Sequence, residues 1–160
     1  MKLVGLIAAA ALAQQQKMDS VRWLVGNWNC HHTVGDFSGD YTSTFASVLG
    51  GLWLRQTYDF PADKDDPARQ ADSFIGYDPR RQYWVRFFAM STGDWFATRM
   101  TETERGWAWK YVSFSKDRKP ETPESDAVFT HRSDSEYAID GPSYEKAGTR
   151  VTEHHVCKKM

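Results

Sequence analysis

The sequence has little excess of charge of either sign. Its 160 residues include 20 Lys and Arg and 21 Asp and Glu, which gives a formal net charge of −1. The basic residues are scattered, and most lie beside acids, as in ETERG and DKDDPARQ. Because a phosphate-binding surface needs basic residues gathered on one face, the sequence predicts no nucleic-acid partner.

Long apolar runs are equally scarce. The run Leu3–Leu12 is too short for a bilayer, which needs about 20 apolar residues, so we expect no transmembrane span. Lys2 precedes this run, and the small residues around Ala13 follow it, which is the order of a secretory signal. We therefore expect residues 1–13 to be a signal peptide and the chain to be exported, either periplasmic or secreted. A buried N-terminal helix is the alternative.

Cysteine occurs only twice, at Cys30 and Cys157, and no CxxC spacing is present. In an exported protein such a pair is predicted first to form a disulfide, because the surroundings are oxidising. Two free thiols or two metal ligands are the alternative.

Recognised catalytic motifs are absent as well. The sequence holds no GxSxG nucleophile elbow, no P-loop, no GxGxxG after a strand and no HExxH. Catalytic residues scattered over the inside of a fold would leave no such motif. The absence therefore favours a binding protein over an enzyme without excluding catalysis.

What the sequence has in abundance is aromatic side chains: seven Trp, seven Tyr and nine Phe. They occur in short alternating runs separated by turn residues, a pattern typical of strands. One short helix, Met18–Val25, is expected before them, and residues 14–160 are expected to form one domain. The predicted strands are Trp28–Val34, Tyr41–Val48, Leu52–Phe60, Ser73–Tyr77, Tyr83–Ala89, Trp95–Met100, Trp107–Phe114, Ala127–Arg132, Glu136–Asp140 and Thr149–Lys158.

About ten sequential strands predict an all-β fold, a closed up-and-down antiparallel barrel, because closure removes exposed sheet edges. A barrel of this size has room for side chains or one small ligand. We expect a small hydrophobic molecule as the partner; a structural barrel with a filled core is the alternative, and the oligomeric state is open. The candidate ligand-binding residues are Trp53, Phe87, Trp95, Trp107, Trp109 and Tyr111, with Arg55 or Arg99 as polar anchors.

Gly26-Asn27-Trp28 has the form Gly-x-Trp and resembles the N-terminal signature of lipocalin and calycin barrels. The order LVGNWNC, VLGGLWLRQTYDF, SFIGYDPRRQYWV and RVTEHHVCKK is similar to a bacterial family of small exported calycin-like proteins of unknown function. The resemblance implies that Gly26 and Trp28 plug the closed end of the barrel, with a basic side chain of the last strand against the Trp.

A branch of that family carries one cysteine two residues after the Trp and another near the C-terminus, and Cys30 and Cys157 match both positions. A closed barrel pairs its first strand with its last. The resemblance therefore implies that the two cysteines are cross-strand neighbours within reach of a disulfide.

If Trp28 faces inward, the two-residue period of a strand turns His32 inward, and Glu153 and His155 share a face with Cys157. These three are the candidate catalytic residues, as a general-base site of a hydratase, isomerase or hydrolase. Cross-strand polar pairing at the barrel rim is the alternative. Their spacing matches no known zinc motif, so no metal is predicted.

A related family of ten-stranded barrels binds haem through a histidine near its C-terminus, and it carries Gly-x-Trp-x-Gly-x-Gly. In this sequence Cys30 and His32 stand at the two later glycine positions, where their bulk opposes the approach of a cofactor. We therefore expect no cofactor, neither haem nor a divalent metal.

Overall fold

Short alternating segments separated by turns form ten strands in the computed structural model, which describes residues 2–64, 66–115, 127–144 and 150–160. A helix precedes the strands, and two single turns of 3₁₀-helix (η1 and η2) connect parts of the chain. The elements are α1 (Lys2–Asp19), η1 (Arg22–Leu24), β1 (Gly26–Val34), β2 (Phe37–Val48), η2 (Leu49–Gly51), β3 (Trp53–Phe60), β4 (Arg69–Asp78), β5 (Tyr83–Met90), β6 (Trp95–Thr103), β7 (Gly106–Phe114), β8 (Ala127–Ser133), β9 (Glu136–Tyr144) and β10 (Arg150–Lys159).

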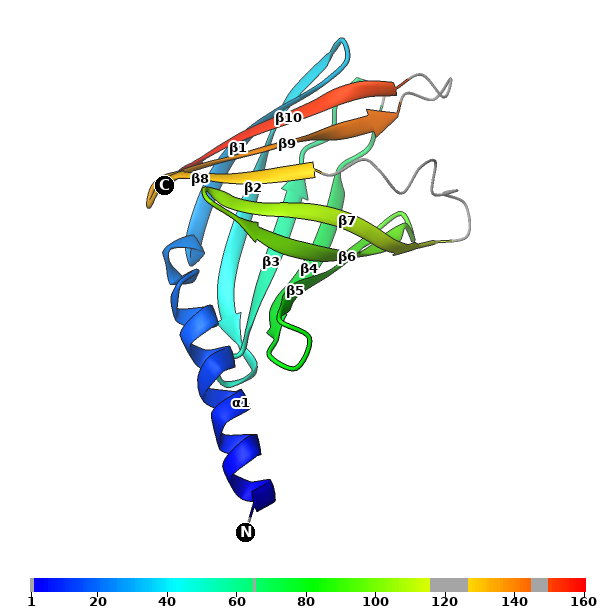
Figure 1. Cartoon of the computed structure of the whole chain (residues 1–160). Helices are drawn as coiled ribbons and strands as arrows, with labels where there is room; N and C mark the ends of the chain where they lie inside the picture. The colour runs from blue at the N-terminus through cyan, green and yellow to red at the C-terminus, as the bar shows by residue number, and fades with distance from the viewer. Residues whose placement is uncertain (1, 65, 116–126, 145–149) are drawn as a thin grey trace.

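Each strand pairs antiparallel with the next, and β10 returns to pair with β1, so the sheet is a closed barrel. Figure 1 shows β10 lying beside β1 although the two strands are far apart in sequence. Closure gives every strand a paired neighbour on both sides, so the sheet has no edge strand. The predicted all-β, up-and-down antiparallel barrel with a short N-terminal helix is confirmed.

All ten predicted strands are present, but several are longer than predicted; β2 begins at Phe37 instead of Tyr41, and β6 continues to Thr103 instead of Met100. Thr149, the predicted start of the last strand, lies outside the described residues. β4 begins at Arg69 instead of Ser73, because Arg69 pairs with Phe60 at the end of β3. β9 continues to Tyr144 instead of ending at Asp140, because its pairing with β10 extends to Arg150. Turn-forming residues in these segments masked the strands in the sequence.

The predicted helix Met18–Val25 is wrong in its bounds. α1 ends at Asp19, and the chain then tightens into η1, where the amide of Leu24 donates to the carbonyl of Val21 (3.0 Å). A three-residue spacing puts Met18, Val21 and Leu24 on one side, and all three are buried against the closed end of the barrel. Among the described residues, no helix is both long and apolar enough to cross a membrane.

Trp28 fills the closed end of the barrel and is completely buried. Its indole Nε1 donates to the carbonyl of Leu24 (2.7 Å), and Lys159 Nζ on β10 lies 5.5 Å from the centre of its ring. Gly26 has φ +133°, and a Cβ on it would lie 3.0 Å from Lys159 Cε. Glycine at this position therefore lets the lysine pass and reach the tryptophan.

A disulfide joins Cys30 to Cys157 across the pair β1–β10. The two residues are direct cross-strand partners at a sequence separation of 127, so the bond joins the first and last strands of the sheet. The structure thus confirms the predicted pairing, and the described residues contain no free cysteine.

Removing the disulfide is expected to destabilise the barrel strongly. In the chain-entropy account, closing a loop of more than 100 residues contributes about 4–5 kcal/mol. Cys30→Ala with Cys157→Ala should therefore lower the free energy of unfolding by about that amount in urea titrations. Wild-type protein in excess dithiothreitol is the control and should approach the stability of the variant. Equal stability of the oxidised wild type and the variant would contradict the role of the bond.

Candidate functional site

The closed end of the barrel interior is packed with side chains. Inward-facing residues of the strands meet Val21 and Leu24 there and leave an internal void of only about 20 Å³. This is barely the space of one water molecule. Trp107 and Trp109 line this void, so both belong to the filled part of the interior.

A band of polar side chains crosses the middle of the interior above this packed end. Gln56 Nε2 donates to Ser43 Oγ (2.9 Å), and both residues are buried. On the neighbouring strands, Arg86 Nε donates to Ser73 Oγ (2.9 Å) and Arg86 Nη2 donates to Tyr58 Oη (2.7 Å). Hydrogen bonding of this kind offsets part of the cost of burying polar groups.

Arg86 is the unusual member of this band because it is a charged residue with only 5% of its surface exposed. Its guanidinium lies over three aromatic rings, with Cζ 4.5 Å from the centre of Trp109 and 5.3 Å from that of Phe88. Among the described residues, no carboxylate pairs with it. Burying a cation without an anion costs several kcal/mol, and aromatic faces return only part of that cost.

The open end of the interior carries a hydrogen-bonded chain of three side chains. His155 Nε2 lies 2.6 Å from Glu153 Oε1, and His155 Nδ1 lies 3.0 Å from the Tyr41 hydroxyl. Because a carboxylate only accepts, a neutral His155 carries its proton on Nε2, and the Tyr41 hydroxyl donates to Nδ1. His32 on β1 stacks against His155, with ring centres 5.4 Å apart.

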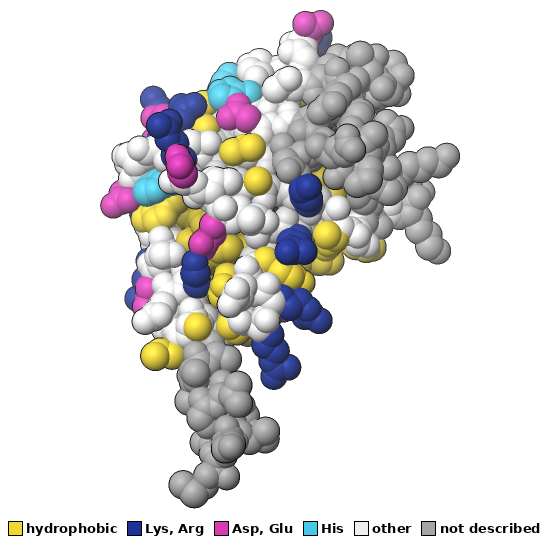
Figure 2. Space-filling model, in the orientation of Figure 1, with side chains coloured by type: hydrophobic (Ala, Val, Ile, Leu, Met, Phe, Trp, Pro, Cys, Tyr) yellow, Lys and Arg dark blue, Asp and Glu magenta, His cyan; other side chains and the backbone are white. Residues whose placement is uncertain are grey.

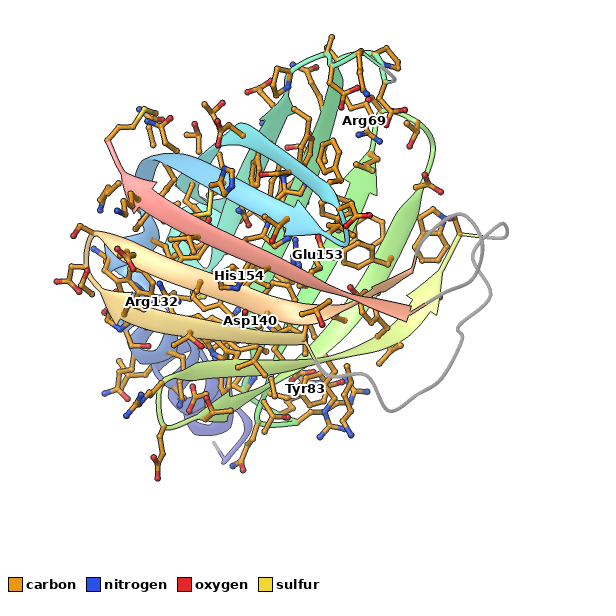
Figure 3. The ribbon with its side chains drawn as sticks, turned by 90° about the horizontal axis from the view of Figure 1, so that it is seen from above. Arg69, Tyr83, Arg132, Asp140, Glu153 and His154 are labelled. Atoms are coloured by element: carbon orange, nitrogen blue, oxygen red, sulfur yellow. A yellow bond between two sulfur atoms is a disulfide. The ribbon has the colours of Figure 1, made fainter. Side chains whose placement is uncertain are left out.

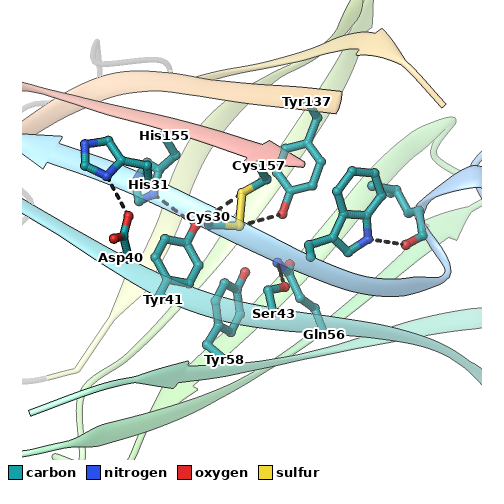
Figure 4. The surroundings of a disulfide bond; sticks show 12 residues. Cys30, His31, Asp40, Tyr41, Ser43, Gln56, Tyr58, Tyr137, His155 and Cys157 are labelled. Atoms are coloured by element: carbon teal, nitrogen blue, oxygen red, sulfur yellow. Dashed lines mark hydrogen bonds and ion pairs between the residues drawn. A yellow bond between two sulfur atoms is a disulfide. The ribbon is translucent and has the colours of Figure 1, made fainter. Parts of the chain in front are cut away.

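The disulfide lies next to this hydrogen-bonded chain (Figure 4). The Tyr41 hydroxyl is 3.7 Å from Cys157 Sγ, and the Tyr137 hydroxyl is 3.7 Å from Cys30 Sγ. The bond therefore holds β1 and β10 together at the level where both strands contribute to the site.

Burial controls the charge states of these groups. It lowers the pKa of His32 below the ordinary value, and the nearby His155 lowers the pKa further. Burial raises the pKa of Tyr41, and it also raises the pKa of Tyr58 and Tyr137. The three tyrosines are therefore neutral at neutral pH and act as hydroxyl groups, not as anions.

A solvent-open cleft of about 1220 Å³ lies beside the mouth of the barrel. Pairing between β2 and β3 begins only at Thr42 and Asp59, so the two strands diverge beyond these residues. Its lining consists mostly of outward-facing side chains, among them His31 and Asp40, together with the inward-facing Tyr41 on β2, Phe60 on β3 and Arg69 on β4. Figure 3 views the barrel from above, with Arg69 and Glu153 on different walls of the barrel.

The eight residues predicted to bind a ligand fall on both sides of the barrel wall. Phe87 is 47% exposed and stacks on Trp95, and Arg99 lies over Tyr83 on the same outer surface. Figure 2 shows hydrophobic and basic side chains side by side at the molecular surface. The outward-facing group is Trp53, Arg55, Phe87, Trp95 and Arg99, and the inward-facing group is Trp107, Trp109 and Tyr111.

Arg55 pairs with Asp72 on the outside (2.7 Å) and Arg99 also lies outside, so neither predicted anchor faces the interior. Arg86 is an arginine that does face the interior. Its sequence signal is its position in QYWVRFFAM, on the same face as Trp84 and Phe88, but both faces of that strand are aromatic. Tyr41 has no comparable signal, because its role depends on His155, more than 100 residues away.

The three candidate catalytic residues, His32, Glu153 and His155, lie together where β1 pairs with β10, as their strand positions predict. They do not form a metal centre: in the part of the chain that the structure describes, no three His, Cys, Asp or Glu side chains are placed to hold a metal ion. The absence of a cofactor stays a prediction.

Comparison with known proteins supports the fold. No known family model matches this chain, and no curated protein matches its sequence. The crystal structure of Rv2717c from M. tuberculosis is similar over 89% of this chain and 96% of that chain, with a TM-score of 0.61 at 12% identity. A redesigned β-barrel matches 86% of this chain and 92% of its own, with a TM-score of 0.49 at 10% identity. At such low identity, the likeness to Rv2717c shows a common fold alone.

The lowered pKa of His32 predicts a loss of stability in mild acid. Unfolded chains take up a proton near the ordinary pKa of 6.5, whereas the folded chain does so only at lower pH. Stability should therefore be complete above about pH 7 and should fall as the pH drops through 6.5 toward the folded pKa. His32→Phe should reduce this loss in urea titrations between pH 7.5 and 5.

His31→Phe is the matched control, because His31 is the next residue of β1 and lies on the outer face beside Asp40. The His31→Phe variant should lose stability in mild acid to the same extent as the wild type. An unchanged pH profile in His32→Phe would show that His32 is not the group responsible.

Proposed function

We propose that this chain is an exported binding protein that holds a small hydrophobic molecule at the open end of its barrel. The observation that carries this proposal is the set of inward-facing rings Tyr41, Tyr58 and Phe60 at the open end, of which Tyr41 and Phe60 also line the cleft beside β2 and β3. Ligand sites are concave and mostly apolar with a few polar groups. The aromatic rings of the open end supply the apolar part, and the outer part of the cleft is polar.

The packing of the interior limits the size of the molecule. Since the closed end retains a void of only about 20 Å³, a ligand has to occupy the mouth half. Aromatic rings continue inward from the cleft: Phe60 stacks with Tyr58, Tyr58 contacts Phe88, and Phe88 stacks on Phe96. Tyr111 contacts Phe96 and is the predicted ligand residue nearest to this set.

Export rests on two features of the chain. Residues 1–13 have the order of a signal peptide, and a disulfide persists in oxidising compartments. Membership of the calycin-like family is part of the same proposal, on the Gly-x-Trp motif at Gly26–Trp28 and on the barrel fold.

Binding is tested with a neutral fluorescent probe, N-phenyl-1-naphthylamine, whose emission rises in apolar surroundings. The wild type should bind it, and Phe60→Ala should weaken binding about tenfold, since a buried aromatic contact contributes 1–3 kcal/mol. Phe87→Ala is the matched control, because it removes the same side chain from the outer face. Equal loss in both variants, or no binding by the wild type, would contradict the proposed site.

Catalysis is a second candidate function, and the hydrogen-bonded chain Glu153–His155–Tyr41 is the observation that favours it. A carboxylate that orients a histidine, which in turn contacts a hydroxyl, is the arrangement of an activated general acid or base. The substrate would be a small apolar molecule in the same cleft, and the reaction a hydration, isomerisation or hydrolysis.

Tyr41→Phe and His155→Ala test this candidate with p-nitrophenyl esters of short acids as the probe of hydrolysis. Loss of a general acid or base should lower turnover by about 10²–10⁴ while N-phenyl-1-naphthylamine still binds. Turnover that is the same in the wild type and in both variants would return these residues to a structural role.

A further inference from the structure

The guanidinium of Arg86 points toward the mouth of the barrel. The backbone partner of Arg86 on β4 is Ile75, yet its Nε reaches Ser73, two residues nearer the mouth. Its Nη2 reaches the hydroxyl of Tyr58, and Tyr58 pairs with Ala71, nearer the mouth again. The charge is thus held in the middle of the interior and faces the half of the barrel that contains Tyr41 and Phe60.

No anion within the described part of the protein neutralises this charge. The groups that contact Arg86 are the hydroxyls of Ser73 and Tyr58 and the rings of Phe88, Phe96 and Trp109. All of them are neutral, and the raised pKa of Tyr58 keeps its hydroxyl protonated. Its Nε and Nη2 donate to the hydroxyls of Ser73 and Tyr58, neither of which carries a negative charge.

The inward face of β4 connects the mouth with this guanidinium. Arg69 stands at the rim, and the next two inward positions, Ala71 and Ser73, have short side chains. The neighbouring walls are apolar there, with Phe60 on β3 and Met90 on β5. Arg69 itself pairs with Asp66 (3.5 Å), so the cation left without a carboxylate among the described residues is Arg86, with apolar side chains between it and the rim. This arrangement suits a molecule with one anionic end and one apolar end.

We propose that the molecule held in the mouth is an amphipathic monocarboxylate, whose carboxylate is bound by Arg86 and whose apolar tail extends toward Phe60 and the cleft. This inference rests on the proposed function and names its ligand class. One guanidinium neutralises one negative charge, and its planar fork of N–H donors matches the two oxygens of a carboxylate. The same site disfavours a neutral alcohol, because that molecule leaves the buried cation uncompensated.

A competition experiment compares dodecanoate with dodecan-1-ol for displacement of the neutral probe N-phenyl-1-naphthylamine. The two competitors share the same tail, so the difference between them reports the headgroup. In the wild type, dodecanoate should bind at least about tenfold more tightly, as expected for a hydrogen-bonded charge pair.

Arg86→Met is the test variant, since it keeps an unbranched apolar side chain in the core and removes the charge. It should abolish the preference for dodecanoate while the probe and dodecan-1-ol still bind. Arg99→Met is the matched control on the outer face, and it should retain the wild-type preference.

The outcomes separate this inference from the proposed function. Equal binding of dodecanoate and dodecan-1-ol by the wild type would overturn the carboxylate site and leave a hydrophobic ligand site in place. A preference that survives in Arg86→Met would also overturn it. Failure of the wild type to bind the neutral probe would overturn the proposed function itself. The comparison in the wild type decides the question even if Arg86→Met does not fold.

Discussion

Pairing between β1 and β10 brings residues near the two ends of the chain into register, and it thereby determines which side chains lie inside the barrel. Cys30 and Cys157 are direct partners in that pair, and the disulfide holds the register at the level of the site. Since side chains alternate between two faces, a shift by one residue would move every inward side chain of a strand outward. His32 and His155 meet inside the barrel only because this register is kept.

The closed interior is divided into two parts with different chemistry. One end is sealed by Trp28, Val21 and Leu24 and is packed almost without voids, so it stabilises the fold and admits no ligand. The other end opens where β2 and β3 diverge, and it contains polar groups in an aromatic lining. Arg86 lies at the boundary of the two parts, where its charge costs stability unless an anion accompanies it. A bound anion would offset the free-energy cost of burying this cation.

Much of the fold was predictable from the sequence because it depends on local patterns. Alternating side chains and turn residues predicted all ten strands, and the two cysteines indicated that the first strand pairs with the last. The site was only partly predictable. His32, Glu153 and His155 followed from counting along strands once Trp28 was assumed to face inward. Arg86 did not, because Trp84 and Phe88 on one face and Tyr83 and Phe87 on the other make the direction of β5 undecidable. Arg55 and Arg99 resembled anchors for the same reason: nothing local separates an outer arginine from an inner one.

The central claim of this account is that the mouth of the barrel is a site for an amphipathic anion with Arg86 as its anchor. A crystal structure of the protein soaked with dodecanoate tests it most directly. The account predicts carboxylate oxygens within hydrogen-bond distance of Arg86, and a tail that runs past Phe60 into the cleft. Dodecanoate found only on the outer surface around Phe87 and Trp95, with the interior around Arg86 free of it, would contradict the claim.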